Sequence, residues 1–421
     1  MAVRAELAKL APAYDWNGAD WNRLTLFAAA LTTSPEIAKA KAQIEAARAD
    51  IRAAQIRPGP TLTLTAEYAF NPPEASPWLL GAASDVLLDA GGRRRGRIEA
   101  AEVAARAASY DYAASVWALR MAVRRALDAS DTAQREAELS ADLLKLRRRQ
   151  LDAMQKRVAA GEASRLDLDL VRADMAAAAN RKTEADAKAV AARLDIAAAL
   201  GLSTDAVDFA HIAASDNTLR EVAPLASEVE AAALQARTEI LQAAAAYDQA
   251  EAVLRKTVAE QYPEVHLGPG YTWERGLAKL PFALTLAFPS ADFGKAAIKS
   301  AELKREAAGR QLEAAVASVT ANIRRADADY RASWKALSII RQETMPTAAS
   351  IAKQADLAFA AGGIDRSEWA ASKAGFITAE LDELTAKARV LDAEAALEDA
   401  LRRPLSGPEL AISAKPKGQG S

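Results

Sequence analysis

The sequence contains no cysteine among its 421 residues and only two histidines, His211 and His266. Without cysteine the chain can form no disulfide, thiolate metal site or acylated lipoprotein anchor. Two histidines give little basis for a metal site or a catalytic triad. The frequent carboxylate pairs, such as Asp167 and Asp169, come with no pocket or partner that acid–base catalysis needs. We therefore expect no cofactor, no bound metal and no enzymatic activity.

Net charge and long apolar runs are also lacking. The 54 Lys and Arg residues nearly balance the 56 Asp and Glu residues, which argues against a general nucleic-acid binder. No stretch approaches the about 20 apolar residues that a membrane-spanning helix needs, and the best run, Leu24 to Leu31, is far too short. Residues 1–10 alternate charged and apolar side chains, unlike a secretory signal. The chain is therefore either cytoplasmic or given without its export signal.

Alanine is the abundant residue, at about a quarter of the chain. Together with Glu, Lys, Leu and Arg, it gives the composition of long helices. Aromatic residues make up only 5%, which is poor material for compact cores in a chain of this length. The composition predicts a mainly helical, elongated protein.

The pattern of the chain occurs twice. A helix opening, a proline before alternating residues and an Asp-x-Gly motif recur at one offset of 203 residues (34 to 237, 60 to 263, 89 to 292). Each half predicts a short helix, two strands, a very long helix, a turn and a returning helix. The expected helices are about 35–57, 90–160, 165–200, 227–260, 293–361 and 366–402. Apolar residues at alternating steps of three and four predict coiled-coil packing of the long helices.

The expected strands are about 61–70, 78–88, 264–273 and 280–288, and they carry most of the functional information. In residues 61–70, apolar side chains such as Leu62 and Leu64 alternate with polar ones. Each segment has about ten residues, which suits a tilted transmembrane strand. Taken alone, one such hairpin is better explained as a soluble hairpin packed on helices, and it is the duplication that favours the membrane interpretation. Four strands cannot close a barrel alone, so their edges require further copies of the chain.

These features resemble the TolC family of outer-membrane efflux factors over about residues 20–402. The most specific motif is the strand exit Leu87-Leu88-Asp89-Ala90-Gly91-Gly92-Arg93-Arg94, which is similar to that of the heavy-metal efflux branch. The next is the turn Ala160-Gly161-Glu162-Ala163-Ser164-Arg165-Leu166-Asp167. The resemblance implies a homotrimer with one outer-membrane β-barrel, a periplasmic helical tunnel and an equatorial region. It also implies a periplasmic adaptor and an inner-membrane resistance-nodulation-division pump as partners.

On this basis we expect four regions: residues 1–33 as an arm with the first equatorial helix, 34–226 and 227–402 as the two repeats, and 403–421 as a flexible tail. The expected function is a passive duct in contact with outer-membrane lipid, passing metal cations or drugs to the exterior. The alternative is a soluble coiled-coil scaffold or adaptor without channel activity. Such a scaffold would fit the missing signal but would not explain the duplicated strand pairs.

The candidate site residues lie at the turns and at the strand exits. Ser164 and Asp167 are expected to cap one returning helix, and Asp365 and Glu368 the other. By the resemblance, these turns (about 160–167 and 361–368) form the tunnel's mouth, where an adaptor docks. The docking candidates are Gly161, Ser164, Arg165, Asp167, Gly362, Gly363 and Asp365. Glu368 is either only a cap partner or a tunnel constriction, and Asp89, Gly91, Asp292 and Gly294 mark the strand-to-helix exits.

Overall fold

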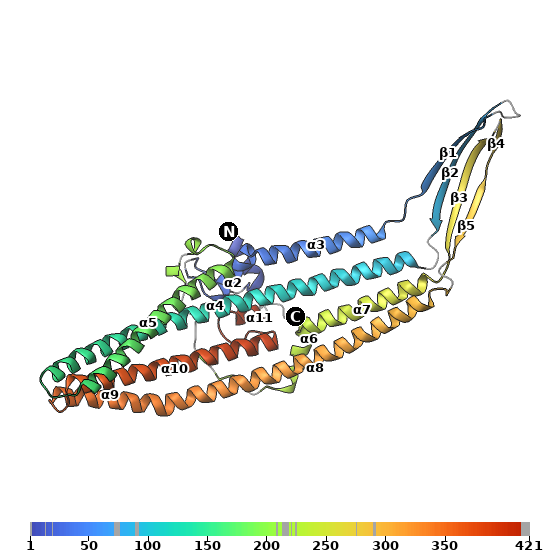
Figure 1. Ribbon diagram of the computed structural model, residues 1–421. Helices are drawn as coiled ribbons and strands as arrows, with labels where there is room; N and C mark the ends of the chain where they lie inside the picture. The colour runs from blue at the N-terminus through green and yellow to red at the C-terminus, as the bar shows by residue number, and fades with distance from the viewer. Residues whose placement is uncertain are drawn as a thin grey trace. The chain divides into compact units, whose positions relative to one another are not determined.

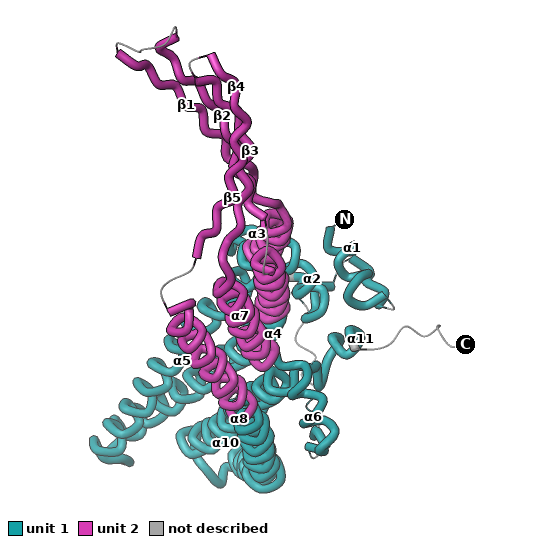
Figure 2. The backbone as a smooth tube through the Cα atoms, turned by 90° about the vertical axis from the view of Figure 1, so that its right-hand side faces the viewer, with its two compact units in different colours: residues 1–38, 115–237, 319–421 teal, residues 39–114, 238–318 magenta. Residues whose placement is uncertain are grey.

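The computed structural model describes residues 2–12, 14–18, 20–70, 76–88, 92–207, 209–212, 219, 221–223, 225–274, 276–288 and 292–413. It divides into two compact units, coloured separately in Figure 2. Unit 1 comprises residues 1–38, 115–237 and 319–421, and unit 2 comprises residues 39–114 and 238–318. Each unit therefore draws on segments that lie far apart in the sequence.

Long helices dominate the described residues, and a small antiparallel sheet accompanies them (Figure 1). This confirms the coarse fold class predicted from composition. The helices are α1 (Ala2–Leu10), α2 (Arg23–Thr33), α3 (Pro35–Gln55), α4 (Arg93–Ala159), α5 (Arg165–Leu200), α6 (Ser227–Ala236), α7 (Thr238–Ala259), α8 (Lys295–Ile339), α9 (Met345–Ala360), α10 (Arg366–Leu401) and α11 (Leu410–Ser413).

Two of the expected long helices are divided. The segment expected as one helix over 227–260 is broken at Arg237, whose backbone is extended. Its guanidinium instead donates to the carbonyl oxygens of Asp399 and Ala400, at 2.9 and 3.3 Å. The segment expected over 293–361 contains one π-helical turn, Ile340–Thr344, between α8 and α9. The break at Arg237 arises in helix-forming sequence without glycine or proline, so local rules do not reveal it. The π-helical turn, by contrast, is followed by Pro346 in the first turn of α9, and proline has no N–H for a regular helical hydrogen bond.

The sheet belongs to unit 2 and has the order β1 (Thr61–Tyr68), β2 (Trp78–Leu88), β3 (Glu264–Glu274), β4 (Leu277–Lys279), with β5 (Phe282–Ala287) also paired to β3. All pairs are antiparallel. The fourth expected strand, 280–288, corresponds to β5, and the short strand β4 precedes it on the other side of Pro281. Pro281 lacks an N–H for the ladder, although its carbonyl still accepts the Gly270 N–H at 2.8 Å. The central β2–β3 pair joins the two halves of the chain.

In unit 1, α4 packs between α5 and α10. One core cluster contains Leu139, Leu143, Leu144 and Leu146 of α4 together with Ala178 of α5 and Ala374 and Leu381 of α10. Alanine at the facing positions lets the helix backbones approach closely, as the coiled-coil spacing predicted. Further along, α2 packs on α4 and α5 through a second cluster that includes Leu26, Val123 and Ile196.

Residues 403–413 also belong to the core of unit 1. Ala411 and Ile412 pack against a cluster that contains Leu7 and Leu24, and Glu409 is buried. Residues 403–413, the described part of the expected tail, therefore pack on helices of unit 1. Glu409 in this segment pairs with Arg23 and Arg120, which lie hundreds of residues earlier in the sequence.

Candidate functional site

The sheet of unit 2 has one apolar and one polar face. Directly opposed residues in an antiparallel pair lie on the same face, and successive residues lie on opposite faces. The register therefore assigns the side chains of each strand to a face. The apolar face carries Leu62, Leu64, Tyr68, Trp78, Leu80, Val86, Leu88, Tyr271, Phe282, Leu284 and Leu286, and all of these are exposed. In soluble proteins such a face is covered by other parts of the fold. An exposed apolar face of this kind is typical of contact with a membrane or with another protein.

The opposite face is mostly polar or small, although it also carries Leu79, Leu87 and Leu277. It carries Thr61, Thr63, Thr65, Glu67, Gly81, Asp85, His266, Gly268, Gly270, Thr272 and Thr285. At the end of the sheet where β3 begins, His266 Nδ1 lies 3.1 Å from Asp85 Oδ2, and its Nε2 lies 3.5 Å from Glu264 Oε2. Glu264 in turn pairs with Arg93 at the start of α4. A polar face of this kind suits contact with water.

The two helical turns of unit 1 form as the sequence predicted. Ser164 Oγ accepts the Asp167 N–H at 3.1 Å, and the Asp167 carboxylate accepts the Ser164 N–H at 3.2 Å. Asp365 and Glu368 form the same reciprocal capping box at the start of α10, with distances of 2.9 and 3.3 Å. Hydrogen bonds from Ser164 lower the pKa of the Asp167 carboxyl below its ordinary value of 3.8.

The two turns lie next to each other. Arg157, near the end of α4, pairs with Asp365 at 2.6 Å and so connects one turn to the other. Gly161 and Gly362 adopt left-handed backbone (φ +78° and +75°) with open space around them, and Gly363 follows directly. Arg165 is exposed at the start of α5. The expected docking residues therefore gather at one end of the helices, and Glu368 makes at least the capping contact expected of it.

The strand-to-helix exits are described in the second half only. The Asp292 carboxylate accepts N–H groups of Gly294 and Ala296, each at 3.1 Å, and so caps α8. Gly294 is left-handed there (φ +74°). Asp89 and Gly91, the matching residues of the first half, lie outside the described residues.

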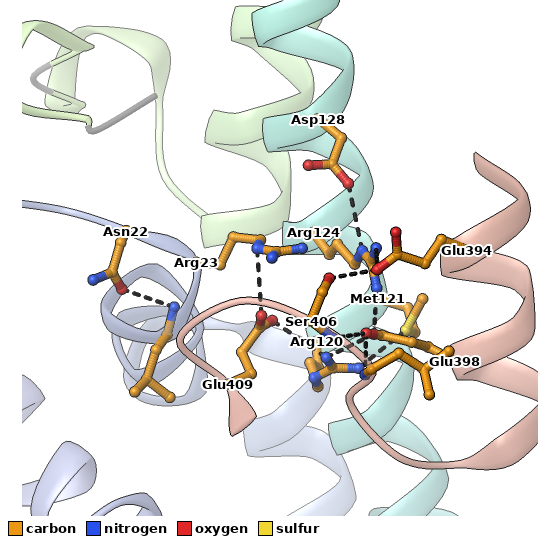
Figure 3. A network of polar contacts seen from close by, with 12 residues as sticks. Asn22, Arg23, Arg120, Met121, Arg124, Asp128, Glu394, Glu398, Ser406 and Glu409 are labelled. Atoms are coloured by element: carbon orange, nitrogen blue, oxygen red, sulfur yellow. Dashed lines mark hydrogen bonds and ion pairs between the residues drawn. The ribbon is translucent and has the colours of Figure 1, made fainter. Parts of the chain in front are cut away.

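A buried network of charged side chains in unit 1 was missed by the sequence analysis (Figure 3). Arg124 of α4 is fully buried and pairs with three carboxylates, Asp128 at 3.4 Å, Glu394 at 3.1 Å and Glu398 at 2.5 Å. Burial alone would lower the pKa of Arg124, but these carboxylates outweigh it and raise the pKa. Burial likewise opposes ionisation of Glu398, but Arg124 and Arg120 hold its pKa below the ordinary value.

The sequence contained a signal for this network. Arg120 and Arg124 are four residues apart on α4, and Glu394 and Glu398 are four apart on α10, so each pair lies on one helix face. Nothing in the sequence shows that these two faces meet. Charged residues at such spacing ordinarily form solvated surface pairs, as Arg135 and Glu138 do here.

Two other properties of the described residues bear on function. No group of three or more His, Asp or Glu side chains in the described part of the chain is arranged to hold a metal ion. Among the described helices, none is long and apolar enough to cross a membrane.

The fold is shared with solved outer-membrane channels. The open-state outer membrane channel MtrE of Neisseria gonorrhoeae is 20% identical and superposes with a TM-score of 0.75 over 91% of this chain and 90% of its own. The outer membrane channel CmeC of Campylobacter jejuni is 13% identical and superposes with a TM-score of 0.75 over 91% of this chain and 86% of its own. The outer membrane protein VceC of Vibrio cholerae is 17% identical and superposes with a TM-score of 0.71 over 91% of this chain and 97% of its own.

The outer membrane efflux protein family matches residues 26–202 and 231–401. The chain therefore belongs to the outer membrane efflux protein family, as the resemblance in its motifs indicated. It is an efflux channel component, and nothing supports the alternative of a soluble scaffold. Comparison with curated protein sequences gives no match.

Proposed function

We propose that three copies of this chain form one duct, with a β-barrel in the outer membrane and a helical tunnel in the periplasm. The observation that carries the proposal is the sheet, which is exposed and apolar on one face and polar on the other. Such a sheet fits a barrel wall whose apolar face contacts lipid and whose polar face lines a water-filled lumen. The duct would pass metal cations or drugs supplied by an adaptor and an inner-membrane pump.

The edges of the sheet support assembly from several copies. Within the described residues, β1 is paired only to β2, and β5 only to β3. In hydrocarbon, unpaired backbone N–H and C=O groups cost several kcal/mol each, so open sheet edges do not occur there. Pairing β1 of one copy with β5 of the next would remove both edges. Four strand positions per copy are too few for one copy to close on itself.

The helices of unit 1 support the same arrangement. Helix α5 buries Val171, Ala178, Ala185 and Ala192, at steps of seven, against its own unit. On its other side it exposes Leu166, Leu170, Val190 and Leu194, while α9 exposes Ile351 and Leu357. A helix that is apolar on opposite sides needs two packing partners. We infer that α5 of one copy packs on α9 of the next and closes the helical ring.

The domain organisation follows from this arrangement. The repeats 34–226 and 227–402 each supply one hairpin to the barrel and one long helix pair to the tunnel, and residues 1–33 contribute to an equatorial region. The two turns form the periplasmic mouth, where Gly161, Ser164, Arg165, Asp167, Gly362, Gly363 and Asp365 meet the adaptor. Glu368 from each copy narrows the tunnel. Asp89, Gly91, Asp292 and Gly294 redirect the chain from barrel to tunnel.

Neighbouring residues of β1 give a matched test of the barrel. Leu64 is 73% exposed on the apolar face, while Thr63 lies on the polar face. On the lipid face of a barrel, Arg costs about 2–4 kcal/mol near the bilayer midplane. We expect Leu64→Arg to reduce the yield of outer-membrane trimer on semi-native gels and Thr63→Arg to leave it unchanged. Equal yields for the two variants would refute the assignment of the faces.

The absence of cysteine gives a direct test of the ring. Single cysteines placed at Leu170 on α5 and Leu357 on α9, which lie at similar distances from the two turns, would cross-link between copies, with a short thiol-reactive linker, into a covalent trimer. The control pairs Val171→Cys, on the buried side of α5, with the same α9 cysteine, and it should not cross-link. Transport itself is tested by the resistance that the chain and its partner pump restore to an efflux-deficient host.

A further inference from the structure

The segment after α10, residues 403–413, is here called the strap. Helix α10 ends at Leu401, and Arg402 takes up the left-handed conformation that turns the chain back (φ +51°). The Glu398 carboxylate then accepts the N–H groups of Leu405, at 2.5 Å, and Ser406, at 3.3 Å. At Gly407 (φ +77°) the backbone passes so close to the Arg23 guanidinium that a Cβ would overlap it. The strap is therefore fitted to side chains of α2 and α10.

Glu409 is the strap residue that enters the buried network (Figure 3). Its side chain is 1% exposed. One carboxyl oxygen lies 3.4 Å from Arg23 Nε, and the other lies 3.4 Å from Arg120 Nη2. Both distances exceed the 2.8 Å between Arg120 and Glu398. Within the described residues, Glu409 Oε2 has no hydrogen-bond donor. The contacts are too long for a well-paired carboxylate.

The network also contains one more carboxyl group than it has cations. Its buried members are three arginines and four acids: Arg23, Arg120, Arg124, Asp128, Glu394, Glu398 and Glu409. An uncompensated charge in such a site is strongly unfavourable, and the usual outcome is that one group becomes neutral. One proton on one acid makes the network neutral.

Geometry identifies which acid holds that proton. Glu398 has two arginines and two backbone donors, and Asp128 and Glu394 both contact Arg124. Among the described residues, the Glu409 carboxyl has only the two 3.4 Å contacts, with Arg23 and Arg120. The groups that face it are Arg23 on α2, Arg120 and Arg124 on α4, and Glu398 on α10. Burial raises the pKa of Glu409 above its ordinary value of 4.5, against the attraction of Arg23 and Arg120.

We propose that Glu409 is a proton-operated latch: the strap docks on α2, α4 and α10 while the Glu409 carboxyl is protonated, and it loosens when the proton leaves. Loosening exposes Arg23 and Arg120 and frees the end of α10 from α2. The latch thus makes the packing of these three helices sensitive to the pH of the compartment they occupy. It rests on contacts within unit 1 and does not depend on the trimer.

The direction of the pH dependence follows from linkage. Because the docked pKa of Glu409 lies above 4.5, docking has its full stability below pH 4.5 and loses it as the pH rises through the docked pKa. Between the two pKa values, release of one proton weakens docking about tenfold per pH unit.

Hydrogen exchange of the full-length protein in detergent, from pH 5 to 9, tests the latch once rates are corrected for intrinsic exchange. In the wild type, protection of residues 403–413 should fall by up to about tenfold per pH unit, while protection of α5 stays constant. Glu409→Gln, which is always neutral, should keep the strap protected at every pH. Glu138→Gln, at an exposed acid of α4, should behave as the wild type.

Three results would overturn the proposal. Strap protection in the wild type could be independent of pH. Glu409→Gln could show the wild-type pH dependence. Glu409→Gln could also lose protection at every pH, which would mean that the charged form holds the strap. If that variant does not fold, the wild-type profile, with α5 as internal reference, decides alone.

Discussion

Replacing Arg124 by methionine is the most severe single test of the buried network. The guanidinium is fully buried and has three carboxylates within 3.4 Å. Methionine has a similar length, so Arg124→Met removes the charge while largely keeping the packing. Asp128 and Glu394 would then be left without the guanidinium that they contact.

The expected cost follows from burial. Removing one partner of a buried ion pair costs about 3–5 kcal/mol, because it leaves an uncompensated buried charge. Solvent does not screen this site, because the Arg124 side chain is fully buried. The matched control is Arg135→Met on the same helix, where the pair with Glu138 is about half exposed. An exposed pair of this kind contributes about 0–1 kcal/mol.

The free energy of unfolding is measured by urea titration in detergent micelles, followed by circular dichroism, with slopes compared among variants. A second variant, which also removes one of the carboxylates, sharpens the result. Arg124→Met combined with Glu394→Met should be less destabilised than Arg124→Met alone, by about 1 kcal/mol or more, because a stranded carboxylate is gone. The reasoning fails if the free energies of unfolding of Arg124→Met and Arg135→Met differ by less than about 1 kcal/mol. It also fails if the separate effects of Arg124→Met and Glu394→Met on the free energy of unfolding simply add.

Further predictions concern the strap and the turns. Gly407→Ala and Gly362→Ala place alanine at similar positive φ, but only the first meets another side chain, that of Arg23. Gly362→Ala should cost about 1–2 kcal/mol of left-handed strain, and Gly407→Ala measurably more by thermal unfolding; equal losses would contradict the close approach. Ser164→Ala should cost about 1 kcal/mol by removing the N-cap of α5, measured by the same method. The folded pKa of Asp167 is lowered, so its capping contribution is present above pH 3.8 and disappears as the pH falls through the folded value. Amide exchange at the start of α5 should therefore accelerate in acid, and a rate independent of pH after correction would exclude this.

The parts of the fold set by short-range rules could be predicted from sequence. Alternation in residues 61–68 predicted β1 and its faces, because side-chain direction in a strand has a fixed period of two. Ser164 with Asp167, and Asp365 with Glu368, predicted two helix starts, because a capping box needs only four residues. Both predictions depend on neighbours in the sequence alone.

The parts set by distant contacts could not be predicted. The break at Arg237 depends on the carbonyl oxygens of Asp399 and Ala400, and the burial of Glu409 depends on Arg23 and Arg120. Arginine and glutamate in helical sequence ordinarily face water. Their burial here depends on which helix faces meet, and that is decided by packing over hundreds of residues.

The buried network also bears on the order of events during synthesis. It joins Arg23 of α2 to Glu409 of the strap, so the core of unit 1 cannot be completed until residue 409 has been synthesised. Contacts this distant in sequence form slowly, because the intervening chain must first be brought together. A nascent chain of this kind stays incompletely folded until residues 403–413 have been made and can dock on helices synthesised long before them.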